Sequence, residues 1–171
     1  MKKETTWKEF GKNDLTHSSA HYLMTIHHLL ETQGYARLSD VAKRLNISKG
    51  SLSTSLKPLF KKNLIEEDDN KHIFLTEEGQ NHAIKIKNTD VIFKHFLTDI
   101  LNVDEETAEI DACKVEHLLS TNSTAKILKL IKALEGNPDL LTAIQKEIKN
   151  HSCTPAGCKE CKKNECCIKE D

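Results

Sequence analysis

Apolar residues recur at steps of three and four along much of this chain, which is the spacing of amphipathic helices. The first such stripe covers residues 18–32, and Gly34 follows it as a helix-ending residue. Its apolar members are Tyr22, Leu23, Ile26, Leu29 and Leu30. We predict a helix over this segment.

Two shorter stripes follow, separated by a tight turn at residues 46–48. Residues 38–45 form the first, with Ser39 as its predicted cap, and residues 51–63 form the second, with Ser48 as its cap. Pro58 lies well inside the later stripe, so we expect the helix to end near Lys57 or to bend there. Helix, turn and helix in this order are typical of a helix-turn-helix unit.

A β-hairpin is predicted directly after this unit. Residues 64–67 and 72–75 are β-prone runs, and the polar residues 68–71 between them form the turn. A helix-turn-helix followed by a hairpin is a winged helix.

The remainder of the chain is predicted to be helical. A long helix begins near Glu77 or Glu78 and carries more apolar surface, up to Leu101, than one small domain needs, so part of it is expected to face a partner subunit. Asp104 caps a helix over residues 105–120. Two shorter helices are expected at 122–135 and 138–149, on either side of a Gly-Asn-Pro break.

Charge is distributed unevenly. The 171 residues carry a net charge of −1, yet residues 36–63 hold seven basic residues against one acidic residue, a local net charge of 7 − 1 = +6. A solvated charged face would explain most such runs, but this one coincides with the polar face of the helix-turn-helix, as phosphate contact requires. The residues expected to contact double-stranded DNA are Arg37, Lys43, Lys49, Ser51, Ser53, Thr54 and Lys57.

Hydropathy and cysteine usage bear on the compartment. No apolar stretch reaches the roughly 18 residues of a membrane span, and the first residues lack the apolar core of a secretory signal, so no membrane partner and a cytoplasmic, reducing location are expected. Five of the six cysteines fall in residues 151–171: Cys153, Cys158, Cys161, Cys166 and Cys167. Either they hold Zn²⁺ or an iron-sulfur cluster, or the tail is a flexible thiol-rich segment that scavenges metal or responds to oxidation.

The sixth cysteine belongs to a second candidate site. Cys113, Glu116 and His117 are related as i, i+3 and i+4 on the predicted helix 105–120, so three types of metal ligand emerge about one turn apart. On spacing alone, a core cysteine beside two solvated residues is the commoner arrangement.

Five segments together resemble the iron-dependent repressor family, of diphtheria-toxin-repressor and manganese-transport-regulator type, over residues 16–150. They are Ala20-His21-Tyr22-Leu23, Ala36-Arg37-Leu38-Ser39-Asp40-Val41-Ala42, Leu75-Thr76-Glu77-Glu78-Gly79, Val103-Asp104-Glu105-Glu106-Thr107-Ala108 and Asp111-Ala112-Cys113-Lys114-Val115-Glu116-His117-Leu118-Leu119-Ser120. The resemblance implies a mainly α protein, with an N-terminal winged helix-turn-helix domain followed by an all-helical dimerisation domain. It also implies a homodimeric repressor that binds operator DNA and is not an enzyme.

The expected boundaries are an N-terminal arm at residues 1–15, the DNA-binding domain at 16–80, the metal-binding and dimerisation domain at 81–150, and the cysteine-rich tail at 151–171. The longer relatives carry a third, SH3-like domain, in whose place this chain has the tail.

By this resemblance, Cys113, Glu116 and His117 match the helix ligands of the iron-type members. His21 stands where relatives place Met or Asp, although His17, His27 and His28 show that histidine is common in this segment. Met24 stands where manganese-type members have Glu, and Asp90 where most members have a His of a neighbouring metal site. At that second site Lys94 and Glu109 replace a carboxylate and a His, so a complete second site is not expected, and Lys94 could instead pair with Asp90.

Two nitrogens, one sulfur and carboxylate oxygen suit Fe²⁺, Zn²⁺, Co²⁺ or Ni²⁺ better than Mn²⁺. The sequence therefore predicts a repressor of metal-uptake genes with Fe²⁺ as corepressor; the alternatives in the same family use Mn²⁺ or Zn²⁺. Two other classes compete: a metal-dependent hydrolase built on the Cys113 triplet, which lacks an HExxH motif, and a thiol, iron-sulfur or metal-handling protein that works through the tail.

Overall fold

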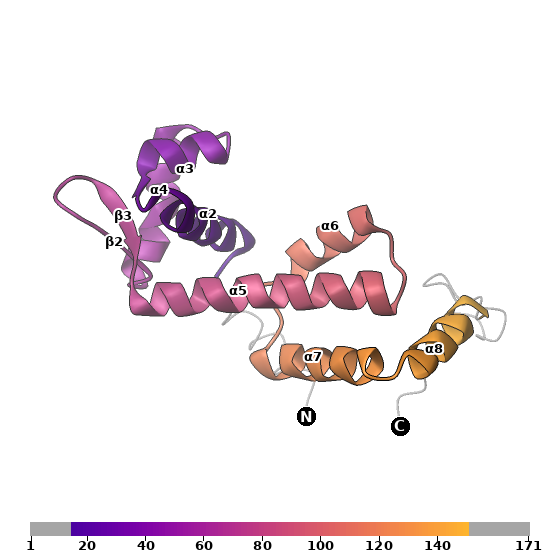
Figure 1. The fold of residues 1–171 in the computed structure, drawn as a ribbon. Helices are drawn as coiled ribbons and strands as arrows, with labels where there is room; N and C mark the ends of the chain where they lie inside the picture. Colours follow the sequence, from indigo (N-terminus) through magenta and orange to yellow (C-terminus); the bar gives the residue numbers. More distant parts are fainter. Residues whose placement is uncertain (1–14, 151–171) are drawn as a thin grey trace, which may run out of the picture.

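A computed structural model describes residues 15–150 of the chain (Figure 1). The predicted cysteine-rich centre at 151–171 and almost all of the predicted arm therefore lie outside the described residues. In chain order the elements are α2 (His17–Gln33), β1 (Ala36–Arg37), α3 (Leu38–Arg44), α4 (Lys49–Lys61), β2 (Ile65–Glu67), β3 (His72–Leu75), α5 (Glu77–His95), the π-helical turn η1 (Phe96–Ile100), α6 (Glu105–Val115), α7 (Thr121–Glu135) and α8 (Pro138–Asn150). The mainly α fold class is confirmed.

The N-terminal domain is a winged helix. Helices α2, α3 and α4 pack on one another, and the three strands form an antiparallel sheet in the order β1-β3-β2, with Ile65 opposite Leu75 in the wing. Apolar members of the predicted helical stripes and β-prone runs fill its core, and they include Leu23, Ile26, Val41, Leu52, Leu56, Leu59 and Ile73. Strand β1 was not predicted because two residues are too short to show an alternating pattern.

The predicted caps and breaks in this domain have mixed outcomes. Ser48 caps α4 as expected, because its Oγ accepts a hydrogen bond of 3.1 Å from the Ser51 amide. Ser39 does not cap α3: that helix begins at Leu38, after Arg37, and the Ser39 hydroxyl donates to Asp40 instead. Helix α4 continues past Pro58 to Lys61, so it does not end near Lys57.

A close backbone contact joins the wing to α5. Thr76 caps α5 by accepting from the Gly79 amide, and its hydroxyl donates to the Asn63 carbonyl at 2.6 Å. The Thr76 amide also donates to the Leu64 carbonyl. A Cβ atom on Gly79 would lie 1.9 Å from the Leu64 carbonyl oxygen, so the start of α5 can approach this loop only with glycine at that position.

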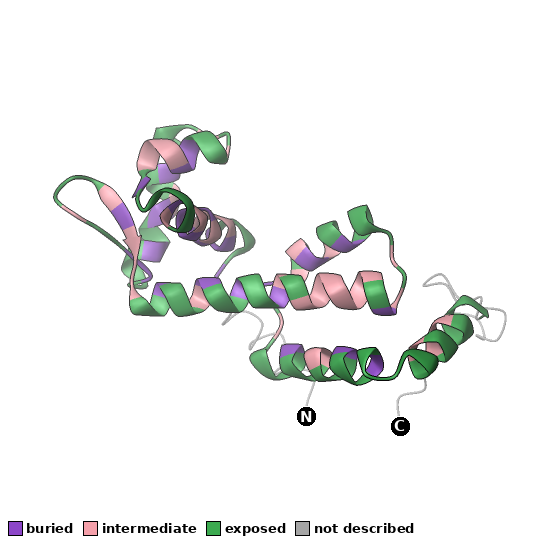
Figure 2. Cartoon of the chain, in the orientation of Figure 1, coloured by how far each residue is buried: buried purple, intermediate pink, exposed green. Residues whose placement is uncertain are grey.

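Helix α5 runs from the wing to the second group of helices, where α6 and α7 pack against it (Figure 1). A second buried cluster, Ile100, Ile131 and Leu134, lies at the far end. Buried residues are concentrated in the N-terminal domain and along α5, whereas α8 has none (Figure 2). Among residues 15–150, no helix combines the length and apolar character that crossing a lipid bilayer requires.

Helix α6 ends at Val115, five residues before the predicted end at Ser120. The Leu118 and Leu119 amides both donate to the Val115 carbonyl, and Ser120 becomes the cap of α7 by accepting from the Ser123 amide. The chain must turn here to begin the next helix, and this requirement overrides the helical spacing of the sequence. Cys113 therefore lies on α6, while Glu116 and His117 lie just beyond its end.

Candidate metal centre

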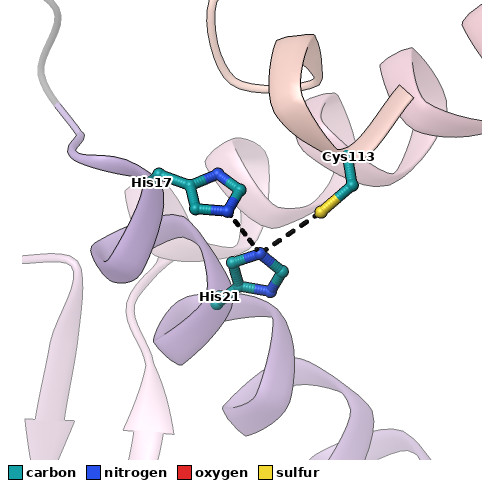
Figure 3. A group of neighbouring side chains, drawn as sticks. All are labelled: His17, His21 and Cys113. Atoms are coloured by element: carbon teal, nitrogen blue, oxygen red, sulfur yellow. Dashed lines mark hydrogen bonds between the residues drawn. The ribbon is translucent and has the colours of Figure 1, made fainter. Parts of the chain in front are cut away.

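Helices α2 and α6 bring three donor atoms together across the chain. His21 on α2 and Cys113 on α6 are 92 positions apart, yet the Cys113 Sγ lies 3.3 Å from the His21 Nε2. The Nε2 of His17, one turn earlier on α2, lies 3.0 Å from the same His21 nitrogen. Figure 3 shows the His21 ring between the other two side chains. The ligand atoms of all three lie within 4.8 Å of one another.

The predicted ligands Glu116 and His117 are not part of this group of ligand atoms, although the His117 ring lies 5.2 Å from the His17 ring, centroid to centroid. The His117 Nδ1 is buried and has no hydrogen-bond partner among the described residues. A buried polar atom without a partner costs free energy, so such an atom calls for a partner that residues 15–150 do not supply. A divalent ion is one such partner, and its chemistry fits the neighbouring thiol and imidazoles.

Burial sets the protonation of the ligands. Desolvation raises the pKa of the Cys113 thiol, and the nearby carboxylates of Glu116 and Asp90 raise it further. Desolvation likewise lowers the pKa of His21 and of His117, with the neighbouring His17 adding to both shifts. These shifts favour a protonated Cys113 thiol and neutral imidazoles at His21 and His117 in the metal-free centre, and metal binding there would release the thiol proton.

Glu116 is the most perturbed carboxylate described. Its side chain is buried, and burial together with the charges of Asp90 and Glu109 raises its pKa to about 7. A carboxylate whose pKa is higher in the folded than in the unfolded chain favours folding below its unfolded value, and this contribution is lost as pH rises from about 4.5 to about 7.

We therefore expect Glu116→Gln to stabilise the metal-free protein at pH 8, by roughly 1–3 kcal/mol, because it removes a buried charge beside two other carboxylates. At pH 4.5 the gain should be much smaller. Urea unfolding in the presence of chelator at both pH values measures the difference, with Glu147→Gln on the exposed α8 as the control. A gain of equal size at both pH values would contradict the assigned titration.

The remaining predicted ligands occupy different surroundings. Met24 packs against the hydrophobic core of the winged helix. Asp90 is half-buried on α5, and burial and Glu109 raise its pKa. The Lys94 ammonium forms ion pairs with Glu109 and Glu105 rather than with Asp90. At the position of the relatives' second metal site, a lysine therefore provides the positive charge next to Glu109.

Five of the seven predicted DNA-contacting side chains lie on the exposed side of α4. Lys49, Ser51, Ser53, Thr54 and Lys57 are all exposed, whereas Leu52, Leu56 and Leu59 on the other side of α4 are buried. Lys43 is exposed on α3. Arg37 is exposed at the wing, where its Nε donates to the His72 Nε2 at 3.1 Å and its guanidinium lies over the Tyr35 ring.

His17 is the member of the group that sequence reasoning missed. Its spacing of four from His21, which places both rings on one side of α2, was the available signal. That signal was hidden by the other histidines of the segment.

Comparison with known proteins gives two matches to family profiles, which meet near the start of α5. Residues 14–73 match "Iron dependent repressor, N-terminal DNA binding domain". Residues 76–144 match "Iron dependent repressor, metal binding and dimerisation domain".

Full-length relatives agree with these matches. The HTH-type transcriptional regulator MntR of Bacillus subtilis is 30% identical over 140 residues, which are 80% of this chain and 98% of that protein. MntR of Listeria welshimeri is 30% identical over 130 residues, 76% of this chain and 91% of that protein.

Solved structures share the fold. The manganese regulator SloR superimposes with a TM-score of 0.59 at 23% identity, covering 66% of this chain and 53% of that one. IdeR of T. acidophilum gives 0.56 at 20% identity, covering 69% and 55%. This chain therefore spans about half the length of these two solved proteins.

Proposed function

This chain belongs to the iron-dependent repressor family and is a metal-dependent transcriptional repressor, and on that premise we propose that Fe²⁺ is its corepressor and metal-uptake genes are its targets. The observation that carries the proposal is the contact between His21 on α2 and Cys113 on α6. This contact supports a ligand set shared between the DNA-binding domain and the helical second domain. We propose residues 16–80 for the DNA-binding domain and residues 81–150 for the second domain.

The proposed ligands are His21, Cys113, Glu116 and His117, with Asp90 beside them. Imidazole nitrogen, thiolate sulfur and carboxylate oxygen suit Fe²⁺ better than Mn²⁺, which prefers mainly oxygen ligands. Mn²⁺ is nevertheless the alternative favoured by the likeness to SloR, a manganese regulator, and Zn²⁺ suits the same donor atoms as Fe²⁺.

A bound ion would hold α2 and α6 in one orientation. Since α2 packs directly on α4, this orientation also sets the direction of α4, the proposed recognition helix, relative to the second domain. In a homodimer, two such helices must reach successive major grooves about 34 Å apart, so only some orientations allow both to bind. Metal and operator DNA then each tighten the binding of the other, because coupling free energy is reciprocal.

The homodimer is supported by large apolar side chains that the described residues leave partly exposed. Ile84 and Val91 on α5 and Leu130 on α7 are each more than two-fifths exposed. Exposed apolar residues of this kind favour a partner subunit. The names of the similar proteins are those of transcriptional regulators, which favours this role over that of a hydrolase.

We expect the purified protein, handled without oxygen, to bind a fragment of its own promoter at least about tenfold more tightly with Fe²⁺ than with chelator. Fluorescence anisotropy measures this affinity, and Mn²⁺ and Zn²⁺ serve as competing candidates. The combined variant Lys49→Glu and Lys57→Glu should lose binding with any metal because it repels phosphate, whereas Lys146→Glu on α8 should bind normally.

Equal affinity with every metal and with chelator would reject the corepressor role. Metal-regulated binding that survives the charge reversal of α4 would instead favour the alternative in which the winged helix contacts protein rather than DNA.

A further inference from the structure

His17 is the first residue of α2 and stands one helical turn before His21. Its ring meets the His21 ring edge-on, with centroids 4.4 Å apart and planes at 83°. Its side chain is exposed, so burial does not require it to point toward this site. It nevertheless points inward, toward His21 and the sulfur of Cys113 (Figure 3).

The spacing of the donor atoms is that of a coordination sphere. Ligand atoms bound to one ion at 2.0–2.3 Å lie roughly 3.0–3.6 Å from one another. The His17 and His21 Nε2 atoms are 3.0 Å apart, and the His21 Nε2 and Cys113 Sγ are 3.3 Å apart. The two separations from the His21 Nε2 therefore already match those that a single ion would impose, and the ligand atoms of His17 and Cys113 lie within 4.8 Å of each other.

A fourth donor is independent of these contacts. The His117 ring lies beside His17, with centroids 5.2 Å apart, and its buried Nδ1 has no partner among the described residues. His17 thus adjoins both the His21 and Cys113 pair and an imidazole that needs a partner.

We propose that His17 is a further ligand of this metal centre, so that three imidazoles, those of His17, His21 and His117, join the Cys113 thiolate and the Glu116 carboxylate. This set selects borderline-soft ions of the Fe²⁺, Co²⁺ and Zn²⁺ class against Mn²⁺. The inference rests on the proposed metal site and adds to it a ligand and a basis for selectivity.

Two metal ligands on α2 constrain the orientation of that helix more than a single ligand does. A single bond to His21 leaves α2 free to rotate about the bond, whereas ligands at i and i+4 fix the direction of the helix axis relative to α6. The proposed ligand set thereby holds the DNA-binding domain at two points.

Co²⁺ is the probe for the test, because its absorption reports thiolate ligation and coordination number directly. The full-length protein is used with Cys153→Ser, Cys158→Ser, Cys161→Ser, Cys166→Ser and Cys167→Ser, so that Cys113 is its one thiol. We expect a thiolate-to-cobalt charge-transfer band in this parent. His17→Ala should keep that band, change the ligand-field bands and weaken Co²⁺ binding at least about tenfold.

Two further variants sharpen the test. His28→Ala, on the same helix but away from the site, should behave as the parent does. His17→Asp should shift the ratio of Co²⁺ to Mn²⁺ affinity toward Mn²⁺ by about tenfold, because it exchanges nitrogen for oxygen.

A thiolate band in the parent with unchanged spectrum and affinity in His17→Ala would overturn the role of His17 while leaving the proposed metal site intact. A parent without the band would overturn the site itself and this inference with it.

Discussion

His117→Ala is expected to abolish the metal response of DNA binding while leaving weak, nonspecific binding unchanged. The substitution removes the buried Nδ1 that has no partner among the described residues, and with it one proposed ligand. Changes to groups that merely orient ligands cost about 10–100-fold in metal affinity, so loss of a ligand should cost at least about 100-fold. The coupling that metal gives to operator binding, about 5–150-fold in this kind of linkage, should then disappear.

Anisotropy titrations with and without Fe²⁺ measure this loss in parent and variant. The basic surface of α4 is untouched, so the salt dependence of nonspecific binding should not change. His82→Ala is the matched control, because His82 is also a half-buried histidine but lies on α5. If metal still increases the DNA affinity of the variant as much as that of the parent, His117 is not a ligand.

Gly79→Ala is expected to destabilise the protein by about 3 kcal/mol or more. Its new methyl group would lie 1.9 Å from the Leu64 carbonyl oxygen and 2.8 Å from the carbonyl carbon, and both are backbone atoms that no rotamer change can move. Either α5 or the loop at Leu64 must shift. Such a shift strains the hydrogen bonds that Thr76 makes to the carbonyls of Leu64 and Asn63.

Gly50→Ala provides a control of opposite sign. Gly50 lies in α4, and a Cβ there meets nothing within 4 Å, so the substitution should be neutral or stabilise the helix by up to about 1 kcal/mol. Urea unfolding followed by circular dichroism gives both values. Equal stability changes for the two variants would contradict the close backbone contact between Gly79 and Leu64.

Local patterns in the sequence predict most of the winged helix because each of its elements is specified by adjacent residues. Gly34 ends α2 in a left-handed conformation, with φ at 80°, and Asp104 caps α6 by accepting from the Thr107 amide. Features decided by tertiary contacts were predicted less well. The end of α6 depends on the turn into α7, and the two residues of β1 become a strand only by pairing with β3.

The ligands of the candidate site also differ in whether local sequence predicts them. Cys113, Glu116 and His117 are neighbours in sequence, and their spacing was sufficient to single them out. The approach of His21 spans 92 positions, and no local pattern predicts it, so it was expected only from resemblance to a family. His17 lies outside the five segments that carry that resemblance, and its part in the site is seen only from the positions of the rings in the structure.

The close contact at Gly79 also bears on how movement passes through the molecule. With 19 residues at 1.5 Å each, α5 is about 28 Å long. Its first turn is in close backbone contact with Leu64, at the start of the wing. If α5 moves as a rigid rod, a tilt of about 5° about its end near η1 displaces the wing by about 2.5 Å. A small tilt of the helical domain would thus become a larger displacement at the proposed DNA-binding surface.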